Sequence, residues 1–250
     1  EVRIALRLAL SAAVAGARLW LLAAWGGVSR ADLLDAWRRL PASAYAAATA
    51  AHLAVYGLRA LRFRVLLPMG RRPGLLAMNA VSAAHNLAAY VLPAKTGEVS
   101  FVVYLRTLCG VSAGAGTAAL IVGRLLDLAT LGLSICAASV WLATVRPELV
   151  PGWLLPAALV PGAAALAVLF ATLRADRLVG LGERLARSAR TDRTAVGRRL
   201  LERARGLAGH FAAISRGDLA LAAVLSTGMW LAVFAFFALL ARGFGLPPAI

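Results

Sequence analysis

Long apolar segments recur along the chain, and their length constrains the fold more than any other feature. They occupy residues 4–25, 42–61, 117–143, 153–173 and 219–241. Each has about 20 residues or more, enough for a helix to cross a hydrocarbon core ~30 Å thick. Hydrophobic residues make up 61% of the chain, far above the average of a soluble domain. The sequence therefore predicts an all-α polytopic membrane protein, built as a transmembrane helix bundle.

Residues 1–250 are expected to form a single integral membrane domain. The first apolar segment is too long, and too closely followed by others, to be a removable signal peptide, so we expect it to stay in the mature chain. The sequence ends at Ile250, shortly after the last apolar segment. We therefore expect the domain to be truncated at its C-terminus.

Basic residues are distributed unevenly, which predicts the orientation of the bundle. The chain carries a formal net charge of +16, and its arginines cluster at 59–72 and 174–216. Short arginine-rich segments stay in the cytoplasm, so both clusters are expected inside, and the poorly basic segments 26–41 and 144–152 outside. The N-terminus is then cytoplasmic. Because membrane orientation accounts for these charges, no nucleic-acid partner is expected.

Residues 75–108 are mostly apolar but interrupted in the middle. The crossings on either side require that this segment starts and ends in the cytoplasm, so it cannot cross the membrane as a whole. We expect a re-entrant helical hairpin at 75–108, in which 75–92 enters, 93–97 turns and 98–108 returns. Pro93 disfavours helix in the residue before it, and Gly97 permits backbone angles that other residues resist.

The predicted tip of this hairpin carries the charged residues Lys95 and Glu98. A charge at membrane depth costs ~2.5 to 3.5 kcal/mol on insertion scales, so such residues are rarely without a role. In one interpretation Lys95 and Glu98 neutralise each other. In the other, Lys95 and the N-terminus of the returning helix bind an anion such as a lipid phosphate. Glu98 would then hold a cationic part of the substrate or neutralise a nearby arginine.

Arg124 and Asp127 lie three residues apart inside the apolar segment 117–143, on one face of a helix. They are expected to form an internal ion pair or to contact the substrate directly. Two stripes of small and polar residues could line a common pocket with them, and His85 is expected to be a core histidine. The stripes consist of Asn79, Ser82, His85 and Asn86 in the first arm of the hairpin, and of Gly123, Asp127, Thr130 and Ser134 in the next segment.

The segment 174–216 is predicted to be a cytoplasmic connector that contains a basic amphipathic helix. Leucines recur on one face, and arginines fill the other. Such a helix lies on an anionic membrane leaflet or packs against the bundle, and both alternatives remain open.

Three motifs resemble the transmembrane family of lysylphosphatidylglycerol synthases, also described as flippase-like domains. They are "LRALRFRVLL" at 58–67, "LPAKTGE" at 92–98 and "GRLLDL" at 123–128. The resemblance implies a bacterial inner (cell) membrane protein with two inverted repeats, of which this chain would hold the first and part of the second. It also implies that the family's recurring residues are Pro93, Lys95, Gly97, Glu98, Arg124 and Asp127.

Taken together, these features predict a flippase-like transporter that binds a phospholipid or lipid-linked headgroup and moves it between leaflets. Its predicted substrate-binding residues are Lys95, Glu98, Arg124, Asp127, Asn86, Pro93 and Gly97. The alternatives are the membrane half of a lipid-modifying enzyme system, for aminoacyl or glycosyl transfer, and a scaffold that recruits such an enzyme. No catalytic, metal-binding or cofactor-binding motif occurs in the sequence, so we expect neither enzymatic activity nor a cofactor. The expected partners are the lipid substrate, the membrane and a lipid-modifying enzyme.

Overall fold

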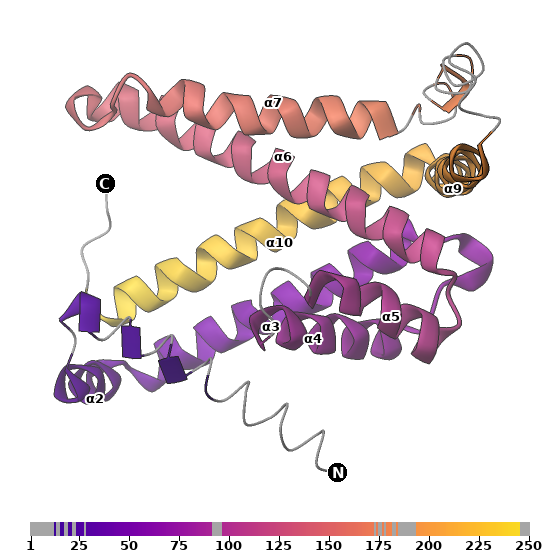
Figure 1. Ribbon diagram of the computed structural model, residues 1–250. Coiled ribbons are helices and arrows are strands. Elements are labelled where there is room, and N and C mark those ends of the chain that lie inside the picture. Colours follow the sequence, from indigo (N-terminus) through magenta and orange to yellow (C-terminus); the bar gives the residue numbers. More distant parts are fainter. Residues whose placement is uncertain are drawn as a thin grey trace.

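The structure is a computed structural model that describes residues 13, 16, 17, 20, 21, 24–27, 29–91, 97–172, 174, 177, 179–181, 184 and 194–245. Throughout these residues every regular element is a helix, as predicted (Figure 1). The α-helices are α2 (Arg30–Arg39), α3 (Ala42–Leu66), α4 (Leu75–Val91), α5 (Gly97–Cys109), α6 (Ala113–Val145), α7 (Leu154–Thr172), α9 (Ala195–Ala212) and α10 (Arg216–Gly243). The short 3-10 helices η1 (Met69–Arg71) and η2 (Pro147–Leu149) lie in two of the connections.

Hydroxyl side chains fix where several of these helices begin. Ser112 precedes α6 and accepts a hydrogen bond from the backbone N–H of Ala115 at 3.3 Å. Thr194 and Ser215 act in the same way at the starts of α9 and α10. Each hydroxyl satisfies one of the backbone donors that a helix N-terminus leaves without a partner. At the other end of α5, Gly110 adopts a φ of 66°, a left-handed conformation that glycine tolerates and that ends the helix.

Two layers of long helices cross each other (Figure 1). Helix α3 packs along α10, while α6 packs along α7 and crosses the first pair. The shorter helices α4 and α5 pack against each other, α4 also against α3, and α5 also against α6. The ion pair between Arg72 and Asp218, 2.7 Å long, joins the loop after α3 to the start of α10.

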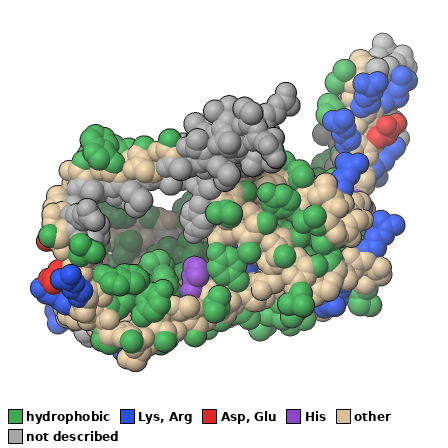
Figure 2. Space-filling model, turned by 90° about the horizontal axis from the view of Figure 1, so that it is seen from below, with side chains coloured by type: hydrophobic (Ala, Val, Ile, Leu, Met, Phe, Trp, Pro, Cys, Tyr) green, Lys and Arg blue, Asp and Glu red, His purple; other side chains and the backbone are tan. Residues whose placement is uncertain are grey.

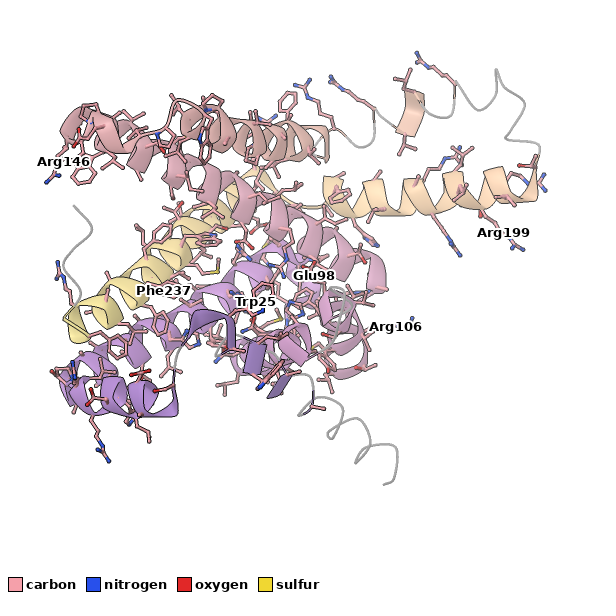
Figure 3. The ribbon with its side chains drawn as sticks, turned by 60° about the vertical axis from the view of Figure 1, so that its left-hand side comes forward. Trp25, Glu98, Arg106, Arg146, Arg199 and Phe237 are labelled. Atoms are coloured by element: carbon pink, nitrogen blue, oxygen red, sulfur yellow. The ribbon has the colours of Figure 1, made fainter. Side chains whose placement is uncertain are left out.

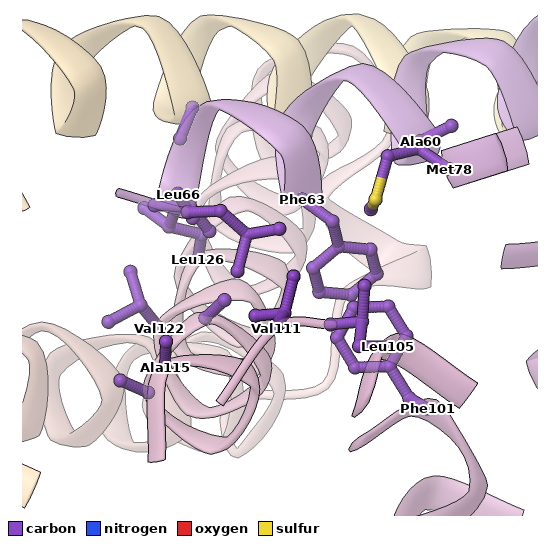
Figure 4. Close-up of a cluster of buried hydrophobic side chains, with 14 of the residues drawn as sticks. Ala60, Phe63, Leu66, Met78, Phe101, Leu105, Val111, Ala115, Val122 and Leu126 are labelled. Atoms are coloured by element: carbon purple, nitrogen blue, oxygen red, sulfur yellow. The ribbon is translucent and has the colours of Figure 1, made fainter. Parts of the chain in front are cut away.

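The hydrophobic core lies where α3, α4, α5 and α6 meet (Figure 4). Phe63 of α3 and Phe101 of α5 are fully buried there, with their ring centroids 4.3 Å apart. Aromatic pairs at such distances stabilise a core beyond the area that they bury. Further core residues include Ala60, Leu66, Met78, Val81, Leu105, Val111, Ala115, Val122 and Leu126.

Within the described part of the chain, α6 and α10 are the two helices both long and apolar enough to cross a membrane. With a rise of 1.5 Å per residue they are about 50 Å and about 42 Å long. Large apolar side chains remain exposed on them, among them Leu133 and Leu231, as expected for surfaces that face lipid. The predicted spans 42–61 and 153–173 correspond to α3 and α7, and 4–25 lies largely outside the described residues.

Helix α9 occupies part of the predicted amphipathic connector. Its C-terminal half packs on α6 and buries Ala208 and Phe211, whereas Val196 and Leu200 near its start are exposed. Arginines gather at this projecting end of the molecule (Figure 2). The second half of α9 thus packs against the bundle.

Candidate functional site

A cavity of about 770 Å³ lies between α3, α6 and α10, with α4 and α5 each contributing one residue. Its volume falls within the range of roughly 300–1,000 Å³ that is typical of ligand pockets. The lining residues recur every three or four positions, because one face of each long helix turns toward the cavity. They are His52, Val55, Tyr56 and Arg59 of α3; Asn86; Glu98; Arg124, Asp127, Leu128 and Leu131 of α6; and Met229, Trp230, Val233, Phe236 and Phe237 of α10.

The cavity has a polar end and an aromatic end. Helices α3 and α10 are antiparallel, since Arg62 contacts Ser226 while the ring of His52 lies 5.1 Å from that of Phe236. The polar end therefore lies at the level of Arg59, and the aromatic end at the level of His52. Glu98 lies among the crossing helices, whereas Arg106, Arg146 and Arg199 lie at the periphery of the molecule (Figure 3). The side chains of His52, Leu128 and Phe237 are exposed, so the cavity opens to the surface beside them.

Asp127 is the centre of the polar end. Arg62 donates to both of its carboxylate oxygens, with Nη2 at 3.2 Å from Oδ2, and the indole N–H of Trp230 donates to Oδ1 at 3.3 Å. Arg62 also donates to the hydroxyl of Ser226 at 3.0 Å. Only 1% of the Arg62 side chain and 13% of the Asp127 side chain are exposed. This buried ion pair joins α3, α6 and α10.

Arg124 connects Asp127 to α5. Its guanidinium lies 3.6 Å from the Asp127 carboxylate and 3.3 Å from that of Glu98. The predicted contact between Arg124 and Asp127 is thus present. Glu98 pairs with an arginine, which is one of the roles considered for it from the sequence. Glu98 and Arg124 are more open to the cavity than the inner pair, with 33% and 41% of their side chains exposed.

Arg59 has a different environment. Its Nη1 donates to the side-chain oxygen of Asn86 at 2.9 Å, and the Asn86 amide donates to the hydroxyl of Tyr56 at 2.8 Å. In the described part of the chain no carboxylate lies within ion-pair distance of Arg59. Arg59 is therefore held in place by neutral hydrogen-bond partners and is not paired with a carboxylate of the described residues.

Gly97 positions Glu98 by allowing α5 to approach α4 closely. A Cβ atom at Gly97 would lie 2.3 Å from the Cα of Ala89, which is too close for any side chain. The reason for a glycine is thus the close approach, and not the unusual backbone angles that we expected, since Gly97 is helical. The buried ring of His85 donates from Nδ1 to the carbonyl oxygen of Gly97 at 3.0 Å, which confirms His85 as a core histidine.

Four of the seven predicted site residues, Asn86, Glu98, Arg124 and Asp127, line the cavity, and Gly97 adjoins it. Pro93 and Lys95 lie outside the described residues. None of the other six members of the two predicted polar stripes lines the cavity. Ser82 is buried, Asn79 is exposed, and Ser134 donates to the carbonyl oxygen of Thr130 in its own helix.

Sequence reasoning missed Arg59 and Arg62, which it treated as members of a cytoplasmic basic cluster. Helix α3 continues to Leu66 and buries the Arg62 side chain against Asp127, so Arg62 belongs to the site. Two features of the sequence could have indicated them. Arg59 and Arg62 are three residues apart, which places them on one face of a helix, and Arg62 is surrounded by the apolar residues Phe63, Val65 and Leu66. Among the described residues, no three His, Cys, Asp or Glu side chains are grouped so that they could hold a metal ion.

Comparison with known families adds one match to this geometry. The model of the family described as "Lysylphosphatidylglycerol synthase TM region" matches residues 4–250. No curated protein and no solved structure matches the chain.

Proposed function

Because the chain belongs to the family of lysylphosphatidylglycerol synthase transmembrane regions, we propose that it binds a phospholipid or lipid-linked headgroup in its cavity and moves this lipid between leaflets. The observation that carries the proposal is the division of the cavity into an ionic end and an aromatic end. A lipid has the same division, since a charged headgroup is joined to apolar chains. The membrane lipid context follows from the family, whereas transport is our inference.

The ionic end supports a headgroup site because charged residues inside a membrane carry a high free-energy cost. Ionisable residues inside membrane helices are rare, and they mark substrate or ion pathways more often than structural contacts. Arg124 lies about 16 Å along α6 from the start of that helix, well away from its ends. Arg59 and Arg124 present guanidinium donors to the cavity, and such donors suit phosphate oxygens.

The aromatic end supports a place for acyl chains. Val233, Phe236 and Phe237 form its wall on α10, opposite Leu128 and Leu131 of α6. Because Phe237 and Leu128 are also exposed at the molecular surface, a lipid could place its headgroup at the ionic end while its chains extend outward into the bilayer. In this arrangement the headgroup would cross the membrane inside the protein, without contact with the hydrocarbon of the bilayer.

We also propose that α4 and α5 form the re-entrant hairpin and enter the membrane from the cytoplasm. Their lengths support this, because 17 and 13 residues give helices of about 26 Å and about 20 Å, each shorter than a ~30 Å hydrocarbon core. The proposal includes a cytoplasmic N-terminus in a bacterial inner membrane. It also includes an inverted-repeat plan, in which a second hairpin would enter from the opposite side.

The second candidate function is the membrane half of a lipid-modifying enzyme system, favoured by the family's description as the transmembrane region of a synthase. In that case the cavity would present a lipid to a catalytic domain and would not need to release it on the other side. A scaffold that recruits such an enzyme would not need to bind the lipid headgroup in the cavity at all. These three functions differ in what purified protein does in liposomes.

The test is leaflet exchange of a fluorescent phospholipid in proteoliposomes, followed by chemical quenching of the outer leaflet. Val233→Trp should fill the cavity and reduce exchange toward the protein-free rate, because Val233 lines it. Val224→Trp is the matched control, since Val224 is an exposed residue of the same helix, and it should exchange lipid like the unchanged protein.

Exchange at the protein-free rate by the unchanged protein, over a panel of anionic, zwitterionic and aminoacylated lipids, would refute transport. Headgroup modification that appears only when a catalytic partner is added would then support the enzyme half. Absence of both lipid binding and exchange would leave the scaffold.

A further inference from the structure

The charges around the cavity are unbalanced. Three arginines, Arg59, Arg62 and Arg124, meet two carboxylates, Glu98 and Asp127, so the described part of the site carries one net positive charge. A buried site that keeps an excess charge favours a ligand of opposite sign, because a buried charge without a partner is costly.

Both carboxylates are already engaged. Asp127 accepts hydrogen bonds from Arg62 and Trp230 and lies close to Arg124, and Glu98 pairs with Arg124. An ammonium group would have to share these carboxylates with the arginines already beside them, and it would add a positive charge to a site that already carries one in excess. The site therefore disfavours an ammonium group.

Among the described residues of the site, Arg59 is the cation that forms no ion pair with a carboxylate. Among the described residues, its hydrogen-bond partner is the neutral Asn86, which is itself fixed by Tyr56. A guanidinium has five N–H donors, and one hydrogen bond leaves most of them for a ligand. Its planar fork matches the oxygens of a phosphate better than a point charge does.

On the basis of the proposed function, we infer that the lipid carried by this cavity is an anionic phosphodiester without a compensating ammonium group, and that Arg59 binds its phosphate. Asn86 and Tyr56 hold the guanidinium at the wall, while the Glu98–Arg124 pair stays intact beside it. The aromatic end takes the chains. Arg59 thus determines specificity for the net charge of the headgroup.

Binding is tested with the purified protein in a neutral detergent by competition against a fluorescent phosphatidylglycerol. Unlabelled phosphatidylglycerol should compete at least about tenfold better than lysylphosphatidylglycerol, whose ammonium groups reverse the net charge, a difference of about 1.4 kcal/mol. Arg59→Gln should lose this preference, and Arg59→Lys should restore part of it. Arg199→Gln, which removes an exposed charge of α9 outside the cavity, should keep it.

Equal or tighter binding of lysylphosphatidylglycerol would overturn the inference, as would an unchanged preference in a folded Arg59→Gln variant. Glycerol phosphate and inorganic phosphate distinguish a lipid site from a site for a free anion. Neither should compete at millimolar concentration, and full competition by either would also overturn the inference. Arg59→Lys keeps the test usable if Arg59→Gln does not fold, because this variant should bind phosphatidylglycerol more weakly than the unchanged protein and retain only part of the preference.

The outcome is independent of the transport assay. Selective binding with exchange at the protein-free rate would refute transport and leave the headgroup specificity standing. If phosphatidylglycerol and lysylphosphatidylglycerol are both exchanged and bound equally well, the specificity would be refuted and transport would stand.

Discussion

Removing the charge of Asp127 should destabilise the protein more than removing its buried partner Arg62. In Asp127→Asn, the Arg62 guanidinium can still donate to the Asn amide oxygen and to the Ser226 hydroxyl, but it loses its paired carboxylate while only 1% of its side chain is exposed. Its Nε already lacks a partner. An uncompensated buried charge costs about 3–5 kcal/mol, and we expect a loss of unfolding free energy of that size.

Removing Arg62 instead leaves the Asp127 carboxylate with other hydrogen-bonding and charged partners. In Arg62→Met the Asp127 carboxylate keeps the Trp230 indole and the neighbouring Arg124, and the Met side chain fills much of the space. The expected loss is about 1–3 kcal/mol. The double variant Arg62→Met/Asp127→Asn removes both charges and should be more stable than Asp127→Asn alone, because the two residues are directly coupled.

Unfolding free energies measured by denaturant titration in mixed micelles would test this order. Asp35→Asn is the control, because it breaks an ion pair with Arg39 whose side chains are 56% and 75% exposed. Such a surface pair within one helix contributes about 0.3–0.5 kcal/mol. The reasoning fails if Arg62→Met is as destabilising as Asp127→Asn, or if the double variant is no more stable than the Asp127→Asn single variant.

Two further predictions concern the hairpin. Gly97→Ala should push α5 away from α4 by about 1 Å or more, because its Cβ would lie 2.3 Å from Ala89, whereas ordinary contacts begin at 3.4 Å. We expect this overpacking to cost about 1–3 kcal/mol of stability and to lower the melting temperature. Gly57→Ala, with free space around it, should be neutral or stabilising, and equal melting temperatures for the two variants would contradict the close approach. Single cysteines at Arg71 and Pro147, in a background without the native cysteines, should react with an impermeant thiol reagent from opposite sides of the membrane, and labelling from the same side would refute the proposed topology.

The helices of this fold were predictable because apolar length is a local property of the sequence. Segments 117–143 and 219–241 lie inside α6 and α10. The end of α3 was not predictable in this way, since the apolar pattern weakens at Arg62 while the helix continues to Leu66. The partner of the buried Arg62 is Asp127, 65 positions away in the sequence, and local patterns do not report such partners.

The ionic half of the site was more predictable than the aromatic half. Glu98, Arg124 and Asp127 stand out because charged residues in apolar segments need a partner or a ligand. Nothing in the sequence distinguishes Phe236 and Phe237 from Phe234, which does not line the cavity. The selection comes from the antiparallel packing of α10 on α3, which brings Phe236 to His52.

The contact between Glu98 and Arg124 also has a mechanical consequence. The polar contacts tie α3, α6 and α10 together through a buried pair, but they tie α5 to α6 through groups that are one-third exposed or more. An exposed pair separates at a cost of about 0–1 kcal/mol, and a buried one at several times that cost. Of the two ion pairs, the one between Glu98 of α5 and Arg124 of α6 therefore separates at the lower cost. Movement of α5 relative to α6 therefore requires only the Glu98–Arg124 pair to separate, while the Arg62–Asp127 pair keeps α3, α6 and α10 together.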